Sequence, residues 1–221
     1  KAGCHRQAVT AARNELRRGR FFTSSSLTYC SMETIVDFTK PRNVVEQYKW
    51  MSTDDILKDL ETKRHNYSIL LCNLKNDVNI GSAVRSHAGF LGGDIILYGH
   101  RKFNRAPSLG TYAYSIIKHL KFVEEIDTVL GEYDEIIGCD FIEGKSTSIW
   151  DHTFDYDKKT LLCFGHEYDG LPEALIQRCH RVLHIPMFGV TRSFNVAVSA
   201  AIVMNEYVRG IYAGKGEAAE K

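Results

Sequence analysis

Short apolar runs that alternate with helix-like stretches constrain the fold of this chain more than any other feature. Each run is four to six residues long, and the runs lie at 68–73, 94–98, 135–139, 161–164 and 182–185. Helical patterns lie between or after them, at 80–90, 108–120, 126–133, 172–178 and 196–212. Apolar strands separated by helices are typical of a parallel sheet that is covered on both sides. The sequence therefore predicts an α/β fold, a mostly parallel sheet with helices on both faces.

Residues 66–213 are predicted to form this domain, and 221 residues suffice for one such domain with an extension. A basic arm and helical extension is expected at 1–65, where Ser52 and Thr53 can cap a helix. The segment 214–221 is rich in glycine and charge and is expected to be a flexible tail.

The first twenty residues carry six lysines or arginines against one acid, Glu15, and a Ser-rich stretch follows at 21–26. This is the composition of an organelle transit peptide and favours a mitochondrial protein, with a cytoplasmic location as the alternative. A basic helix that lies on RNA phosphates and an ordinary solvated helix end are also open interpretations.

Bulk properties exclude several classes of protein. No apolar run approaches the roughly 20 residues of a membrane helix, so no membrane partner is expected. The six cysteines lack C-x-x-C spacing, and no metal site is expected. Because the net charge is only +1, contact with nucleic acid must come from local basic patches.

Three segments at predicted strand ends carry unusual polar residues. In 76–85, Asn79 can cap a helix, Gly81 permits close approach of another backbone, and Arg85 lies in the second turn. The segment 164–172 holds Glu167 in a turn bounded by glycines, and the third, 185–195, ends at Ser193 and Asn195. Capping and solvation explain each of them alone, but ligands of open α/β sheets bind beyond the carboxyl ends of strands.

In this order and spacing, the three segments resemble the signature motifs of the SPOUT methyltransferases, SpoU (TrmH) branch. The matching residues are Asn79, Gly81 and Arg85; Gly165, Glu167, Gly170 and Leu171; and Ile185-Pro-Met, Gly189, Ser193 and Asn195. The resemblance covers 66–212. Two residues depart from the family's common Ser-Leu-Asn-Val-Ser, since Phe194 replaces leucine and Ala197 replaces serine.

The resemblance implies a fold and an activity. It implies a deep C-terminal trefoil knot, bound S-adenosylmethionine, and 2′-O-methylation of a ribose in rRNA or tRNA, free or in a ribosomal assembly intermediate. It further implies a homodimer, or a dimer with a paralogue, whose active site lies across the interface.

The resemblance and the chemistry of the side chains together give the candidate site. Arg85 is expected to hold a phosphate bidentately and to stabilise an incipient alkoxide, with the proton passing to substrate phosphate or water. Ser193 and Asn195 are expected to orient Arg85 and the ribose, Asn79 to hold its loop, and Glu167 to anchor Asn79 or Arg85. Candidate cofactor-binding residues are Gly165, Ile185, Phe194, Cys139, Ser193 and Met187, and candidate RNA-binding residues are Arg101, Lys102 and Arg105.

Two other functions are compatible with parts of the sequence. A non-catalytic RNA-binding or ribosome-assembly factor could keep this fold, and the departures Phe194 and Ala197 leave that interpretation open. A dinucleotide-dependent oxidoreductase would need three glycines after the first strand, whereas 76–85 contains one.

Overall fold

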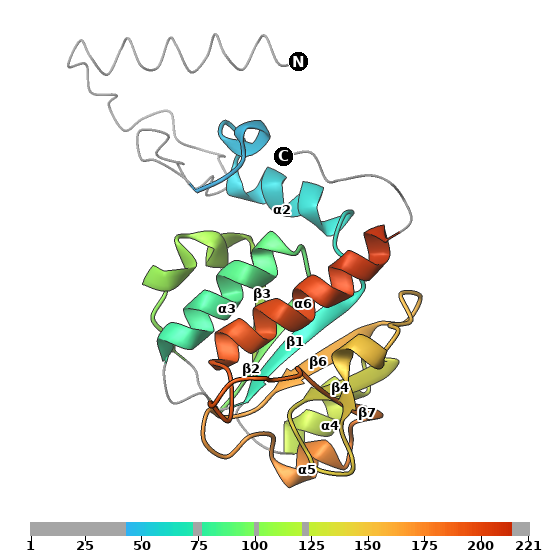
Figure 1. Cartoon of the computed structure of the whole chain (residues 1–221). Coiled ribbons are helices and arrows are strands. Elements are labelled where there is room, and N and C mark those ends of the chain that lie inside the picture. Colours follow the sequence, from blue (N-terminus) through green and yellow to red (C-terminus); the bar gives the residue numbers. More distant parts are fainter. Residues whose placement is uncertain (1–42, 73–76, 100–101, 121–123, 214–221) are drawn as a thin grey trace, which may run out of the picture. The chain divides into compact units, whose positions relative to one another are not determined.

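The computed structural model describes residues 43–72, 77–99, 102–120 and 124–213, all within one compact unit, Phe38–Lys221. Seven strands form one sheet in the order β3-β2-β1-β6-β4-β7-β5, and every pair of neighbours is parallel (Figure 1). The strands are β1 (Tyr67–Cys72), β2 (Asp94–Tyr98), β3 (Ile116–Leu120), β4 (Glu135–Cys139), β5 (Thr147–Ser148), β6 (Thr160–Phe164) and β7 (Arg181–His184). The α/β prediction of a mostly parallel sheet is confirmed.

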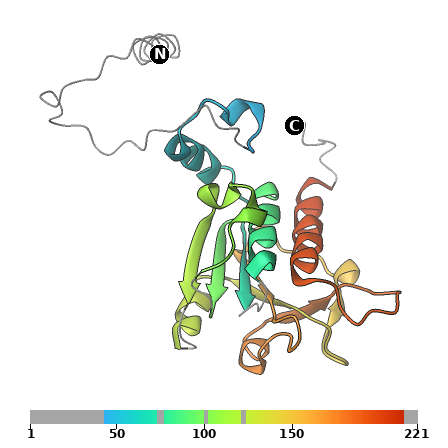
Figure 2. The ribbon, with the colours of Figure 1, turned by 90° about the vertical axis from the view of Figure 1, so that its left-hand side faces the viewer.

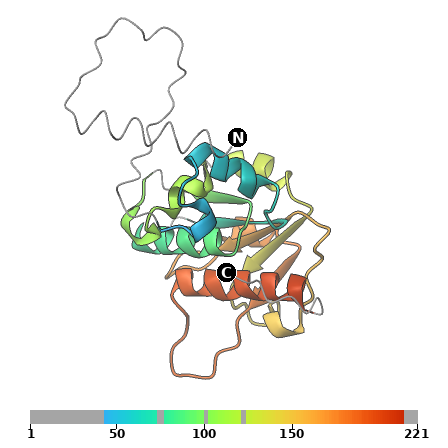
Figure 3. The ribbon, with the colours of Figure 1, turned by 90° about the horizontal axis from the view of Figure 1, so that it is seen from above.

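Helices cover both faces of this sheet. The helices are α2 (Thr53–Glu61), α3 (Asp77–Gly89), α4 (Glu124–Leu130), α5 (Glu173–Ile176) and α6 (Val196–Tyr212), with 3-10 turns η1 (Glu46–Tyr48), η2 (Ala106–Ser108), η3 (Thr111–Tyr114) and η4 (Ile149–Asp151). Figures 2 and 3 show α3 and α6 side by side over one face.

The two cores follow from the alternation of side chains along each strand. In β1, Ile69 and Leu71 pack with residues of α3 and α6, whereas Leu70 and Cys72 pack with residues of α4 and α5. All six residues of β1 are buried, because successive side chains point to opposite faces and both faces are covered.

One predicted element is wrong. The segment 108–120 was expected to be a helix, but it forms η3 and the edge strand β3. Leu109 and Gly110 have positive φ values of 47° and 85°, which interrupt a helix. Ile116 and Ile117 follow, and β-branched neighbours favour extended backbone. On β3, Lys118 pairs with Asp94 at 2.7 Å and Glu132 at 3.2 Å.

The predicted cap before α2 is present, since Ser52 accepts a hydrogen bond from the Asp55 N–H at 3.1 Å. Arg64 donates to the carbonyls of Gly92 and Tyr114, joining the segment after α2 to the sheet domain. Residues 1–42 of the predicted arm and extension at 1–65, and the predicted tail at 214–221, lie outside the described residues, so the domain boundaries stay predictions. No helix in the described part of the chain is long and apolar enough to span a membrane.

A fully buried histidine of α3 packs against β1. His87 is 0% exposed, and neither ring nitrogen has a hydrogen-bond partner among the described residues. The ring of Tyr67 packs edge-on against the imidazole, with the ring centroids 5.6 Å apart. Gly92 leaves room for the imidazole, because a Cβ on Gly92 would lie 2.2 Å from His87 Nε2. Burial, with a smaller contribution from the charge of Arg64, lowers the pKa of His87 to about 3.

His87 should make stability depend on pH. Below about pH 6.5, His87 is protonated in the unfolded chain but stays neutral in the native protein. The free energy of unfolding should therefore fall as the pH drops toward 3. The slope from this group is up to about 1.4 kcal/mol per pH unit, and the effect is absent above pH 7. Urea denaturation at a series of pH values should show a smaller slope for His87→Leu than for the wild type. Equal slopes would contradict the assignment.

Candidate active site

The site lies where the order of the strands reverses. From β1 the chain passes through α3 to β2 on one side, and from β6 it passes through α5 to β7 on the other side. Because β1 and β6 are parallel neighbours, the segments that follow them diverge at the same edge of the sheet. Asn79 and Glu167 are 88 residues apart in sequence, and this arrangement brings them into contact.

One chain of hydrogen bonds joins the three polar segments. Asn79 Nδ2 donates to Glu167 Oε1 at 2.9 Å, and Asn195 Nδ2 donates to Asn79 Oδ1 at 3.0 Å. Asn195 Oδ1 accepts the N–H of Ala197 at 2.9 Å and so caps α6. The cap fixes the orientation of the Asn195 amide, so its nitrogen faces the amide oxygen of Asn79. The amide nitrogen of Asn79 then faces Glu167, whose oxygen accepts its hydrogen bond. Glu167 therefore contacts Asn79, one of the two residues that it is predicted to anchor, and the roles of these residues in the reaction stay predictions.

The turn that carries Glu167 depends on two glycines. Gly170 has φ +69°, and its backbone exchanges two hydrogen bonds with His166, at 2.9 and 3.0 Å. A Cβ on Gly165 would lie 2.1 Å from the carbonyl carbon of Gly170. Close approach of the chain to itself therefore explains the need for glycine at position 165, and contact with a cofactor there stays a prediction.

Asp140 supports the same turn and was missed in the sequence. Its Oδ2 accepts the N–H of Leu171 at 2.8 Å, and its Oδ1 accepts the N–H of Phe141 at 2.8 Å. A Cβ on Gly170 would lie 2.4 Å from Asp140 Oδ2. Its position in the sequence could have indicated this role, because Asp140 directly follows the predicted strand 135–139 and is a polar residue at a fourth strand end.

Arg85 and Ser193 lie apart from the hydrogen-bonded chain. Both are exposed, and Arg85 has no hydrogen bond or ion pair with any described residue. Six helical positions separate Arg85 from Asn79, so their side chains point about 120° apart around the axis of α3. A single copy of the chain therefore brings Asn79, Glu167 and Asn195 together and leaves Arg85 and Ser193 facing solvent.

The candidate cofactor-binding residues lie at the end of β4, directly after β6, and in the segment between β7 and α6. Ile185, Met187 and Cys139 are partly buried, and Phe194 is 40% exposed. Burial raises the pKa of the Cys139 thiol well above its usual value, so this group is neutral at physiological pH. Cys139 and Ile185 pack against the same hydrophobic core, and the joint role of the four residues in binding a cofactor stays a prediction. No cluster of His, Cys, Asp or Glu in the described ranges could hold a metal ion.

Residues 66–205 match the SpoU rRNA Methylase family, nearly the same span that the motifs indicate. The chain belongs to this family. An uncharacterised tRNA/rRNA methyltransferase of Mycolicibacterium gilvum is 27% identical over 175 residues, which are 75% of this chain and 54% of that protein. The tRNA (guanosine(18)-2′-O)-methyltransferase of Aquifex aeolicus is 24% identical over 161 residues, 68% of this chain and 72% of that one.

A solved SpoU methyltransferase has a similar fold. The structure of AviRb from Streptomyces viridochromogenes in complex with the cofactor AdoMet superimposes with a TM-score of 0.60 at 26% identity. The alignment covers 68% of this chain and 63% of AviRb. This SpoU-family chain spans about half the length of the Mycolicibacterium relative.

The basic loop after β2 packs against α3. A Cβ on Gly81 would lie 2.6 Å from the carbonyl oxygen of Asn104, so the predicted close approach of another backbone to Gly81 is confirmed. Lys102 and Arg105 are exposed, and the Arg105 guanidinium lies 4.7 Å above the ring of Tyr112. Arg101 lies outside the described residues, and RNA binding by this loop stays a prediction.

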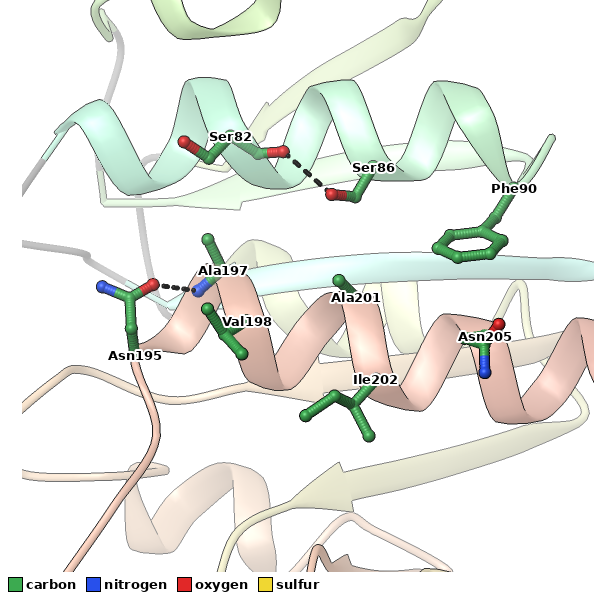
Figure 4. A pocket seen from close by; sticks show the side chains of 9 residues that line it. All are labelled: Ser82, Ser86, Phe90, Asn195, Ala197, Val198, Ala201, Ile202 and Asn205. Atoms are coloured by element: carbon green, nitrogen blue, oxygen red, sulfur yellow. Dashed lines mark hydrogen bonds between the residues drawn. The ribbon is translucent and has the colours of Figure 1, made fainter. Parts of the chain in front are cut away.

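A shallow apolar groove separates α3 from α6 (Figure 4). Its lining comes from Ser82, Ser86 and Phe90 of α3 and from Asn195, Ala197, Val198, Ala201, Ile202 and Asn205 at and within α6. The hydroxyls of Ser82 and Ser86 donate to the carbonyls of Val78 and Ser82 within α3. Because these hydroxyls bond within their own helix, the groove presents mostly apolar surface.

The turn at 165–170 can be tested with two glycines of the family motifs. Gly165→Ala should lower the free energy of unfolding by about 2 kcal/mol or more, because its methyl group overlaps the backbone of Gly170. Gly189→Ala should change it by less than about 0.5 kcal/mol, because nothing lies within 4 Å of its Cβ. Urea denaturation measures both. Equal effects of the two substitutions would contradict this account of the turn.

Proposed function

We propose that this SpoU-family chain transfers a methyl group from S-adenosylmethionine to the 2′-hydroxyl of a ribose in tRNA or rRNA. The observation that carries the proposal is the hydrogen-bonded chain Glu167–Asn79–Asn195, which joins all three family motifs at the carboxyl edge of the sheet. The family match, the printed activity of the Aquifex relative and the AdoMet complex of AviRb support the reaction type and the cofactor.

The residues present fit S-adenosylmethionine. Ile185, Met187 and Phe194 would hold its apolar parts, and the neutral thiol of Cys139 places no competing charge beside a sulfonium. When bound, the cofactor supplies an activated methyl group. The chain's own contribution is the geometry of the turn after β6 and of the start of α6, which Asp140, Gly165 and the Asn195 cap hold fixed.

Arg85 is proposed to act on the RNA. A guanidinium stays protonated in proteins, so its role here is to bind a phosphate with two parallel hydrogen bonds and to stabilise the developing alkoxide. The hydroxyl proton then passes to substrate phosphate or water. Because Arg85 has no partner among the described residues, its hydrogen-bond donors are available to a ligand.

We also propose that a second copy completes the site. Arg85 lies one helical turn after Ser82, a residue of the groove between α3 and α6, so Arg85 borders this groove. Val198 is 47% exposed within the groove, an apolar side chain suited to burial in an interface. Pairing of two copies through the groove would bring the partner's surface to the exposed Arg85.

The trefoil knot belongs to the same proposal. The chain leaves β7 two strands away from β6, yet α6 returns to pack beside α3 over β1 and β6. A trefoil knot requires the last segment of the chain to pass through a preceding loop, and this return of α6 is compatible with such a passage. The match to the SpoU family supports the proposal of a knot.

Arg85 can be tested by methyl incorporation from labelled S-adenosylmethionine into tRNA and rRNA, followed by mapping of the modified ribose. Arg85→Ala should reduce the rate by about 100-fold or more while cofactor binding is retained. Arg85→Lys should recover little of this loss, because lysine lacks the planar fork.

Full turnover by Arg85→Lys would contradict the bidentate role. If the wild-type chain methylates no RNA and binds no cofactor, the alternative function, an RNA-binding assembly factor with this fold, is supported instead.

The dimer can be tested by light scattering and by the same methylation assay. Ile202→Glu places a charge in the groove and should convert a dimer into a monomer with reduced activity, since a buried unpaired charge is costly. Val45→Glu is the matched control, because Val45 is 50% exposed and lies outside the groove. A monomeric wild type, or an Ile202→Glu protein that stays dimeric and active, would contradict pairing through this face.

A further inference from the structure

Two large aromatic side chains stack on each other at the surface, outside the residues assigned to the reaction. Trp150 of η4 is 63% exposed, and Phe188 of the segment after β7 is 85% exposed. Their ring centroids are 5.9 Å apart, and the ring planes differ by only 18°. Figure 3 shows the segment between β7 and α6 extending away from the body of the domain. We call Trp150 and Phe188 the aromatic platform.

The aromatic platform belongs to the carboxyl edge of the sheet. Trp150 follows β5, whose Ser148 is paired with His184 at the end of β7, and Phe188 comes four residues after His184. The segment that carries Phe188 continues directly to Asn195, the cap of α6 and a member of the hydrogen-bonded chain. A ligand that stacks on the aromatic platform is therefore bound on loops that also build the candidate active site.

The stacked rings of the aromatic platform suit a planar, neutral ligand, and the charged residues nearest to them in sequence have opposite signs. Asp151 adjoins Trp150 and Arg192 follows Phe188 in the same segment, and both are exposed. Because one is acidic and the other basic, these two residues together contribute no net charge to the segments that carry the rings. Nucleobases have no charge and stack on aromatic rings whatever their sequence.

A second copy of the chain is a poorer occupant. An aromatic side chain buries about 150–250 Å² at most, so two rings supply only part of the roughly 1,200–2,000 Å² of a stable interface. The groove between α3 and α6 is the apolar surface proposed for pairing, and neither Trp150 nor Phe188 lines it.

We propose that Trp150 and Phe188 stack on an unpaired base of the RNA substrate near the ribose to be methylated. This inference rests on the proposed function, because it assumes that RNA is the ligand at this edge. The substrate class is then RNA with at least one base outside a helix, since only an unpaired base offers its ring face. Loops and bulges of folded RNA meet this requirement, and uninterrupted duplex does not.

Tryptophan fluorescence tests the proposal directly, because the chain has only two tryptophans, Trp50 and Trp150. In Trp50→Phe, the remaining Trp150 should be quenched by a single-stranded RNA of about 12 nucleotides. An abasic oligonucleotide with the same backbone should quench it much less. In Trp150→Phe, the remaining Trp50 should not respond, because Trp50 is 73% exposed near η1, and η1 and α2 lie at the amino-terminal end of the strands (Figure 2).

Binding constants give the second readout. Trp150→Ala and Phe188→Ala should each weaken binding of this RNA by about tenfold, and Trp50→Ala should leave it unchanged. If the fluorescence of Trp150 does not change when RNA is added, the proposal is overturned, even if the wild-type chain methylates RNA. Fluorescence that changes with protein concentration in the absence of RNA would also overturn it, because a second copy would then cover the rings. Base-dependent quenching without methylation would support the aromatic platform while contradicting the proposed enzyme.

Discussion

The side-chain amide of Asn79 is the contact on which the candidate site depends. It is 93% buried and lies between a carboxylate that accepts its N–H and a second amide that donates to its oxygen. Hydrogen bonds of this kind contribute only about 0.5–1.5 kcal/mol each, rising to about 3 kcal/mol for a charged partner. Their larger effect is geometric, because they join α3, the turn after β6 and the start of α6 at one place.

The sheet makes this contact possible at low cost in chain entropy. Parallel strands place all their carboxyl ends at one edge, so segments separated by 88 residues meet without any long loop of their own. Asp140 supports the turn after β6 by accepting the N–H of Leu171, and it also accepts the N–H of Phe141, the residue that follows it. The site is therefore assembled at one edge of the sheet, and sites supported by strands and helices keep their geometry better than sites on loops alone.

How much the sequence reveals depends on whether a pattern is local. The strands at 94–98 and 135–139 have the predicted bounds, because an apolar run between turn residues is a short-range signal. The edge strand β3 was mistaken for a helix, because its sequence Ile-Ile-Lys-His-Leu is neither a continuous apolar run nor an alternating one. Its Lys118 is stabilised by Asp94 and Glu132 from other segments. Asp140 was missed for a similar reason, since the hydrogen bond that gives it a structural role comes from the N–H of Leu171, 31 positions away. Family spacing identified Asn79, Glu167 and Asn195, but only the structure shows that they form one hydrogen-bonded chain.

The first turn of α6 connects fold, site and surface. Asn195 caps the helix with its oxygen and binds Asn79 with its nitrogen, and the next turns bury Ala197, Ala200 and Met204 against the sheet. The same helix leaves Val198 and Ile202 along the groove that faces away from the sheet. Because one rigid helix carries all three sets of contacts, a partner docked in the groove would be held in fixed relation to Asn79. Arg85, on the neighbouring helix, would gain a defined position from that partner. This explains how an arginine that is exposed in one copy can still belong to an ordered site.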